Sequence, residues 1–306
     1  MTVKKQPVVD LNAVLAGVQK LYAKDPKSQA MIVAGIKDHA YTEEDGVPLP
    51  EGNIIRELAG IPCLPYSKII QVAGNPDTGK STTAASAISA AQAAGFQVII
   101  WETEGKFDAS RLRHFGGDPE KLAFVKTNEI LQGAEKVRKI IHALKKAYPE
   151  VKILLVWDSI GGSQSRSHAE KELDNEKSAQ PGQDAKENAS VMRMLAALFN
   201  KYPDSISVYA ANQVYAKIGM FQFGDAQSGG KKVEFYSSLI IVLKRIKTLT
   251  KTAGGKKIKV GIITRATVQK NHLSQSKTSI HQLDFQITAD SVHPVDMVDG
   301  DDSEED

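Results

Sequence analysis

The sequence predicts an α/β fold in which a mostly parallel sheet is flanked by helices and ends in antiparallel edge strands. Between residues 67 and 211, short apolar runs alternate with helical segments, and a glycine-rich turn joins the first run to the first helix. Further on, two strand-like runs flank Gly254-Gly255. Alternating strands and helices produce parallel sheets covered on both faces, and a glycine-containing turn between strands is typical of a hairpin.

The segment before this domain has a different character. Residues 10–22 carry apolar side chains at helical spacing, which predicts a helix. Residues 41–53 are acidic and polar and contain Pro48 and Pro50, so we expect a linker there.

The main domain then follows the alternation expected of its fold. Its predicted elements are, in order, strand 68–72, helix 81–94, strand 97–101, helix 130–144, strand 152–157, helix 191–199, strand 205–211, and hairpin strands 239–249 and 258–268. Residues 165–188 are polar and almost free of apolar side chains, which predicts a long loop of functional or disordered character. Trp101 and Trp157 fall on central strands, where core packing is expected.

Composition excludes several classes of protein. The chain has 306 residues, of which 42% are hydrophobic, and it contains no apolar run long enough to span a membrane. Its one cysteine, Cys63, predicts a reducing, cytoplasmic location. The seven histidines show no spacing typical of a zinc site.

Charge is distributed unevenly along the chain. Residues 231–277 contain twelve Lys or Arg and one acid, whereas residues 296–306 contain seven acids and no base. A basic body with an acidic tail is one pattern of proteins that bind nucleic acid, and a solvated face with a disordered end is the alternative. The basic hairpin 244–259 could equally follow phosphates or protect a sheet edge from aggregation.

A phosphate-binding loop is the most specific motif in the chain. The sequence G-x-x-x-x-G-K-S follows a strand and opens a helix, which is the arrangement that such a loop requires. Its glycines let backbone N–H groups surround phosphate oxygens, and the lysine and serine reach the phosphates and Mg²⁺. A glycine-rich turn with a chance lysine is the alternative. The residues expected to bind nucleotide here are Gly74, Asn75, Pro76, Asp77, Thr78, Gly79, Lys80, Ser81 and Thr82.

Acidic residues end two of the predicted strands. Asp158 follows an apolar run, where an acid needs a partner, and Mg²⁺ would be that partner, with Ser81 as second ligand. A simple turn cap is the alternative. Glu102 and Glu104 end another strand at i and i+2, so they should point the same way and either could face the γ-phosphate. A solvated strand end is the alternative for this pair.

Several motifs in this order resemble the RecA family of recombinases over residues 10–288. Besides the phosphate loop, they are Glu102-Thr103-Glu104, Trp157-Asp158-Ser159, Asn212-Gln213, Lys217-Ile218-Gly219, Gly229-Gly230, Val233–Ser238 and Phe285-Gln286-Ile287. The resemblance implies a P-loop ATPase core with a small N-terminal helical arm that docks on the next subunit. It divides the chain into an oligomerisation arm with linker (1–50), a RecA-like core (51–288) and an acidic disordered tail (289–306).

The activity implied by the resemblance is that of a DNA-dependent ATPase that uses ATP and Mg²⁺. Such a protein forms helical filaments on single-stranded DNA and exchanges strands with homologous duplex DNA, aided by a single-strand-binding protein and a loader. A ring helicase with the same core and an accessory ATP switch without DNA binding are the alternatives.

The resemblance also assigns roles to residues at the nucleotide site. Glu104 and Lys80 match catalytic residues, and Gln213 matches the glutamine that senses the γ-phosphate. Asp108 and Arg111 match positions near the adenine, and Lys270 matches a lysine that reaches ATP on the neighbouring protomer.

DNA binding is assigned to two loops, residues 165–188 and 214–232. Aromatic and methionine side chains in the second loop could wedge between bases or stack on them, or could pack locally. The residues expected at DNA are Arg193, Lys217, Gly219, Met220, Phe221, Phe223, Gly229, Gly230, Lys231 and Lys232.

Two positions and the length of the C-terminal segment depart from the pattern of bacterial RecA. Arg111 stands where an aromatic residue is usual, and His272 stands where a second cross-interface lysine is common. After Ile287 only 19 residues remain, too few for a large C-terminal domain. The resemblance is therefore to a compact, phage-type member.

Overall fold

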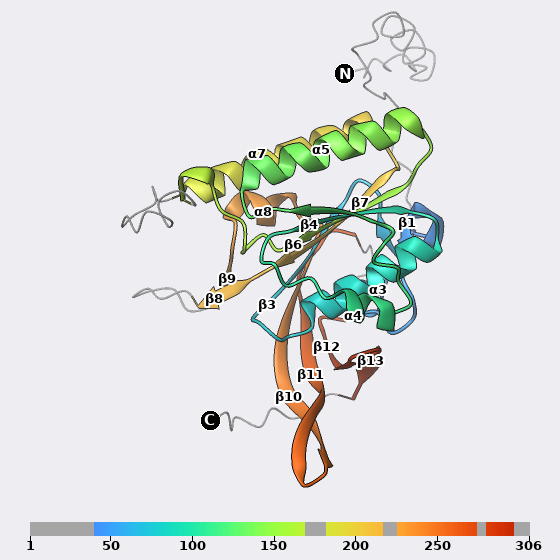
Figure 1. Cartoon of the computed structure of the whole chain (residues 1–306), viewed down its shortest axis with the longest axis vertical. Helices are drawn as coiled ribbons and strands as arrows, with labels where there is room; N and C mark the ends of the chain where they lie inside the picture. The colour runs from blue at the N-terminus through green and yellow to red at the C-terminus, as the bar shows by residue number, and fades with distance from the viewer. Residues whose placement is uncertain (1–39, 169–181, 217–224, 274–279, 297–306) are drawn as a thin grey trace, which may run out of the picture. The chain divides into compact units, whose positions relative to one another are not determined.

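The computed structural model describes residues 40–168, 182–216, 225–273 and 280–296 (Figure 1). The chain divides into two compact units, Met1–Ala40 and Tyr41–Asp306. All described residues except Ala40 belong to the second unit. The helix predicted at 10–22 and residues 297–306 of the acidic tail lie outside the described residues.

A nine-stranded sheet forms the centre of the described unit, in the order β13-β12-β11-β10-β3-β7-β6-β4-β5. Strands β10, β3, β7, β6, β4 and β5 run parallel to their neighbours, and β10 to β13 pair antiparallel, which confirms the predicted fold class. The strands are β3 (Ile69–Gly74), β4 (Gln97–Glu102), β5 (Leu122–Lys126), β6 (Ile153–Asp158), β7 (Ile206–Asn212), β10 (Leu239–Ala253), β11 (Lys256–Asn271), β12 (Gln282–Thr288) and β13 (Val292–Val295).

Helices cover both faces of this sheet (Figure 1). On one face lie α3 (Lys80–Ala93) and α4 (Ala109–His114), and on the other α5 (Ile130–Ala147) and α7 (Gln183–Lys201). Alternate residues of each central strand face the two layers: Val98 and Ile100 of β4 join the core under α3, whereas Ile99 and Trp101 join the core under α5 and α7. Both faces of each central strand are therefore buried, and the strands are mostly apolar, as buried parallel strands are.

The two tryptophans confirm the expected core packing. Trp101 and Trp157 are both 1% exposed. Their rings stack with centroids 4.3 Å apart, on the paired strands β4 and β6. Helix α5 packs closely against Trp101, since a Cβ added to its Gly133 would lie 2.1 Å from the Trp101 ring.

The segment predicted as a linker is part of the folded unit. Residues 43–45 form the short helix η1 (Glu43–Asp45), followed by β1 (Gly46–Pro48), which pairs antiparallel with β2 (Cys63–Pro65). Val47 and Leu49 are almost fully buried, which the surrounding acids and prolines conceal in the sequence. Asn53 then caps α2 (Ile54–Ala59) by accepting the Ile55 N–H at 2.9 Å.

Three other segments differ from expectation. The polar loop predicted for 165–188 ends earlier, because α7 already begins at Gln183 and buries Glu187 and Asn188. Strands β5 and β13 were not evident in the sequence, since both are short edge strands in which most side chains are exposed or only partly buried. Pairing of β13 with β12 also extends regular structure into the segment predicted as a disordered tail.

Two findings bear on the predicted environment. Among the residues described, no helix is long and apolar enough to cross a membrane. Cys63 is fully buried, and burial raises the pKa of its thiol to about 12.

Candidate functional site

The phosphate loop joins β3 to α3 at the carboxyl edge of the sheet, where ligands of α/β proteins bind. Two of its glycines are required by geometry. Gly79 has a φ of 101°, and a Cβ there would lie 2.3 Å from Ile287 Cδ1. A Cβ on Gly74 would lie 2.6 Å from Thr78 Oγ1 and 2.7 Å from the Leu243 carbonyl oxygen. The loop therefore closes only with glycine at these positions.

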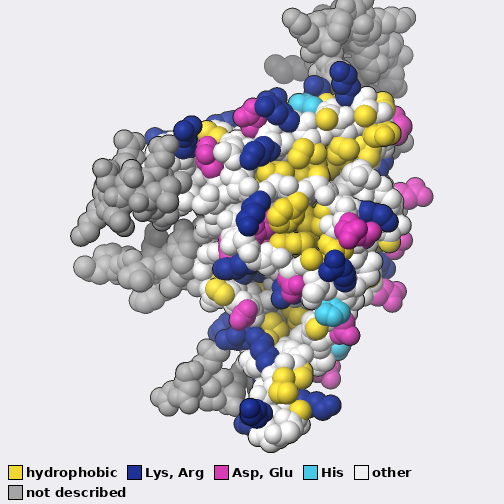
Figure 2. Space-filling view, viewed as in Figure 1, with side chains coloured by type: hydrophobic (Ala, Val, Ile, Leu, Met, Phe, Trp, Pro, Cys, Tyr) yellow, Lys and Arg dark blue, Asp and Glu magenta, His cyan; other side chains and the backbone are white. Residues whose placement is uncertain are grey.

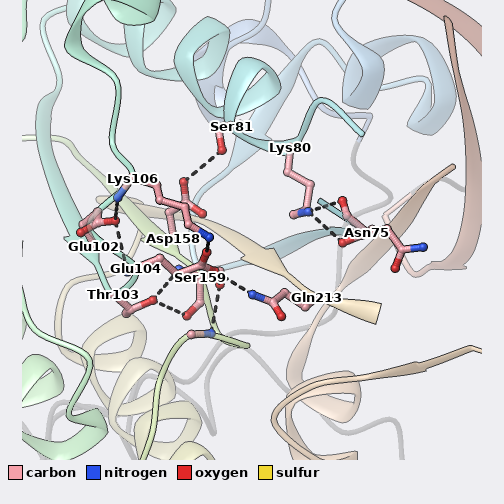
Figure 3. Close-up of polar contacts among 12 residues, drawn as sticks. Asn75, Lys80, Ser81, Glu102, Thr103, Glu104, Lys106, Asp158, Ser159 and Gln213 are labelled. Carbon is pink, nitrogen blue, oxygen red and sulfur yellow. Dashed lines mark hydrogen bonds and ion pairs between the residues drawn. The ribbon is translucent and has the colours of Figure 1, made fainter. Parts of the chain in front are cut away.

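Lys80 points into this loop. Its Nζ donates to the carbonyl oxygens of Gly74 at 2.8 Å and Asn75 at 2.7 Å (Figure 3). Burial lowers the pKa of Lys80, although the nearby carboxylates of Asp158 and Glu104 oppose that effect. A partly desolvated ammonium in a loop at a helix N-terminus is a strong site for phosphate oxygens.

Ser81 and Asp158 form the candidate metal site. Ser81 Oγ lies 3.5 Å from Asp158 Oδ2 (Figure 3), so the start of α3 and the end of β6 bring the two predicted ligands together. Burial, followed by the charges of Glu104 and Glu102, raises the pKa of Asp158 to about 6. A cation would relieve that electrostatic cost.

These donors fit Mg²⁺ in particular. In the described part of the chain, no group of three or more His, Cys, Asp or Glu side chains could hold a metal. One hydroxyl and one carboxylate beside a phosphate loop suit a cation that takes its other ligands from water and phosphate. When bound, Mg²⁺ would neutralise charge on the transferred phosphate.

Glu104 lies at the centre of a polar cluster (Figure 3). Its Oε1 accepts from Ser159 Oγ and, at 2.8 Å, from Gln213 Nε2, while Oε2 accepts from Lys106 Nζ at 2.9 Å. Burial alone would raise the pKa of Glu104, but these three donors outweigh burial and lower the pKa. Glu104 is therefore ionised at neutral pH and oriented by its partners.

Glu102 has a different task from Glu104. The strand ends at Glu102, so the alternation expected for i and i+2 does not extend to Glu104. Glu102 is 2% exposed, and its Oε1 accepts the backbone N–H groups of Glu104 at 3.2 Å and Lys106 at 2.8 Å. It holds the turn that carries Glu104, and the two carboxylates have separate partners.

Gln213 connects this cluster to the second predicted DNA loop. Its side chain donates to Glu104, and its carbonyl oxygen accepts the Ser228 N–H at 3.1 Å. Asn212 Nδ2 donates to the Ser228 carbonyl oxygen at 2.9 Å. Hydrogen bonds thus connect the end of β7 both to Glu104, the candidate catalytic base, and to the returning end of the loop.

Asp108 and Arg111 line a cavity of about 470 Å³ together with the phosphate loop. The carboxylate of Asp108 caps α4 by accepting the N–H groups of Ser110 at 2.9 Å and Arg111 at 3.2 Å. Arg111 Nη2 lies 3.9 Å from Asp108 Oδ2. This cavity has the place and size to hold the rest of a nucleotide beyond its phosphates.

The other predicted residues lie apart from that cavity. Lys270 Nζ donates to the carbonyl oxygens of Glu234 and Phe235 at the end of α8 (Lys231–Tyr236). Arg193 is exposed on α7, where it donates to Ser190 Oγ at 2.9 Å.

The described parts of the second loop are β8 (Val214–Ala216), β9 (Asp225–Gln227), which pairs antiparallel with β8, and the segment that leads to α8. Gly229 and Gly230 have φ of 91° and 82°, and Cβ atoms there would meet Ile160 Cγ2 at 2.7 Å and Ala185 Cβ at 2.8 Å. Lys231 and Lys232 follow as exposed residues of α8. Lys217, Gly219, Met220, Phe221 and Phe223 lie outside the described residues.

Some residues of the site were not predicted. Ser159 and Lys106 both contact Glu104. The only sequence signals for these contacts were that Ser159 is next to Asp158 and that Lys106 is two residues after Glu104. Tyr209 donates to the Lys80 carbonyl oxygen at 2.9 Å, and β11 and β12 close one wall of the cavity. Those contacts join segments far apart in sequence, so no local sequence pattern predicts them.

Comparison with known proteins identifies the family of this chain. A family model described as the RecA N-terminal domain matches residues 11–289. The chain belongs to the RecA family. Protein RecA of Ureaplasma parvum serovar 3 is 29% identical over 260 residues, which cover 84% of this chain and 72% of the relative. Protein RecA of Mycolicibacterium gilvum is 30% identical over 229 residues, which cover 74% of this chain and 61% of the relative. The predicted family resemblance is confirmed.

Proposed function

We propose that the chain is a DNA-dependent ATPase that forms helical filaments on single-stranded DNA and exchanges strands with homologous duplex DNA. Membership of the RecA family supports an ATPase and recombinase role in general. The observation that supports the finer proposal is the connection from Glu104 through Gln213 to Ser228. It gives the nucleotide site a direct contact with the end of the loop proposed to bind DNA.

Each step of the proposed chemistry has its own residues. Lys80 and the loop N–H groups bind the phosphates, and Ser81 and Asp158 hold Mg²⁺. Glu104 accepts a proton from the attacking water, while Ser159 and Gln213 fix the orientation of its carboxylate. Asp108 and Arg111 line the cavity proposed for the adenine base. Lys270 lies apart from this cavity, and we assign it to a neighbouring protomer's nucleotide, for which it would leave the carbonyl oxygens of Glu234 and Phe235.

A substitution of Glu104 tests the assignment of the base. Glu104→Gln keeps the shape of the side chain and removes the proton acceptor, so ATP binding should survive while turnover falls by about 10²-fold or more. Fluorescent-nucleotide binding and phosphate release measure the two effects. Turnover equal to that of the wild type would remove Glu104 from the role.

Imaging tests the assembly and the DNA partner. Negative-stain microscopy with single-stranded DNA and a non-hydrolysable ATP analogue should show helical filaments. Closed rings would favour a helicase, and single particles with unstimulated hydrolysis would favour an accessory switch. Strand exchange between a labelled oligonucleotide and its homologous duplex then tests the recombinase activity.

A further inference from the structure

Lys106 is a charged residue at the candidate active site that the proposed chemistry does not use. Its Nζ lies 2.9 Å from Glu104 Oε2, and its side chain is 79% exposed, whereas that of Glu104 is 22% exposed. The other donors to Glu104, Ser159 and Gln213, both act on Oε1. Lys106 therefore occupies the one carboxylate oxygen that no other described residue holds.

This contact opposes the proposed chemistry. A carboxylate oxygen accepts about two hydrogen bonds, so Oε1 is already filled by Ser159 and Gln213. A proton taken from water must then go to Oε2, which is bound by an ammonium. A neighbouring positive charge stabilises the ionised carboxylate and makes it a weaker base. Glu104 can act well only after Lys106 has moved.

The local structure lets Lys106 move without disturbing Glu104. The backbone N–H groups of both residues are held by the buried Glu102 carboxylate, at 3.2 Å and 2.8 Å. Gly105 between them has a φ of 72°, and a Cβ there would meet nothing within 4 Å. The backbone is fixed while the exposed lysine side chain is free to change rotamer, so the contact can open by a side-chain motion alone.

We propose that Lys106 is a positioning residue that clamps Glu104 in the chain without DNA, and that Mg²⁺ with ATP draws it away only in part until DNA is also bound. The inference rests on the proposed ATPase function. The charged γ-phosphate of bound ATP would offer Lys106 a competing anionic partner. The lysine ammonium already interacts electrostatically with Asp158 and Glu102 as well as with Glu104. The clamp would keep hydrolysis slow until nucleotide and DNA are both in place.

Turnover tests the consequence of the clamp. Lys106→Met should raise DNA-independent hydrolysis by about fivefold, with KM for ATP within about twofold of the wild type. DNA-stimulated hydrolysis should change less, so the stimulation ratio falls. Lys106→Arg keeps a cation there and should restore the low basal rate. Lys121→Met is the matched control, because Lys121 is 78% exposed and pairs with Asp118 at 3.3 Å, away from the site. A basal rate in Lys106→Met no higher than in Lys121→Met would overturn the proposal.

Chemical labelling tests the contact without any need for hydrolysis. Acetylation of each lysine by an N-hydroxysuccinimide ester is followed by peptide mass spectrometry, with Lys121 as internal reference. In the free chain, Glu104→Gln should speed labelling of Lys106 by about threefold or more, which corresponds to about half a pKa unit. Mg²⁺ with a non-hydrolysable ATP analogue should change the labelling of Lys106 relative to Lys121 in the wild type. Unchanged labelling in both comparisons would overturn the clamp even in an active ATPase, whereas an inactive wild type with altered labelling would contradict the ATPase proposal alone.

Discussion

Asp158 shows how a single functional residue opposes stability. It ends a strand whose other five residues are buried, beside Glu102 and Glu104. Its pKa of about 6 lies above the ordinary value of 3.8. The folded chain therefore binds more protons than the unfolded chain between these two pH values, and its free energy of unfolding falls as pH rises through this window. Above the window the ionised carboxylate destabilises the free chain by up to about 3 kcal/mol.

Replacing that carboxylate should have opposite effects on stability and binding. Asp158→Asn should raise the melting temperature of the free chain at pH 7.5, with a much smaller gain at pH 4.5, because the carboxylate is then largely protonated. It should also remove the stabilisation that Mg²⁺ with nucleotide gives the wild type. Asp118→Asn is the control. Hydrogen bonding lowers the pKa of Asp118, so removing this carboxylate should not stabilise the protein at neutral pH. An unchanged or lower melting temperature for Asp158→Asn at pH 7.5 would contradict the assignment.

At the scale of elements, the sequence predicts those that carry a strong local signal. The four central strands of the phosphate site are mostly apolar. Asp158 ends one of them, and the phosphate loop and Gln213 follow two others, so their meeting at one sheet edge could be predicted. Strand β5 and the first turns of α7 could not, because their burial depends on neighbours distant in sequence. The partners of Glu104 likewise depend on how β4, β6 and β7 align.

Helix α5 lies close to the sheet because of one small residue. Gly133→Ala adds a methyl group 2.1 Å from the Trp101 ring, so the helix and sheet must separate or the indole must shift. Overpacking of this kind costs about 1–3 kcal/mol, against a gain of up to about 1 kcal/mol in helix propensity. Urea denaturation should show net destabilisation. Gln132→Ala, at the exposed neighbouring position, should change stability little, and equal stability of the two variants would show that α5 packs less closely than the structure indicates.

Gln213 should carry coupling between strand β7 and the second loop. We expect Gln213→Ala to bind ATP, and to bind single-stranded DNA weakly, but to lose the mutual enhancement of the two ligands. Linkage requires the loss to be equal in both directions. Fluorescence anisotropy of labelled DNA with and without an ATP analogue measures one direction, and nucleotide titration with and without DNA measures the other. If the ATP analogue leaves the DNA affinity of the wild type unchanged, this coupling is already refuted.

At the scale of the whole molecule, charge is segregated between the described unit and the end of the chain. The β10–β11 hairpin extends beyond the helical layers and displays Lys and Arg side chains (Figures 1 and 2). Its bases include Lys244, Lys247, Lys251, Lys256, Lys257 and Lys259. The acidic residues 296–306 follow directly after β13 in the sequence, and β13 belongs to the same antiparallel part of the sheet as the hairpin. Opposite charges in one chain can pair with each other or with outside partners.

Removing the acidic end tests whether it competes with DNA. Deleting residues 296–306 takes away seven acids and raises the formal net charge from +3 to +10. A tethered segment acts at an effective concentration on the order of millimolar, so even weak contacts with the basic surface matter. Each base released from the tail can neutralise a DNA phosphate and displace a counterion, so the truncated chain should bind single-stranded DNA more tightly, most clearly at low salt, and with a steeper salt dependence. Mg²⁺ screens the tail and should narrow the difference between the two proteins. A salt titration of DNA binding decides the matter, because coincident curves at every salt concentration would leave the tail with no competing role.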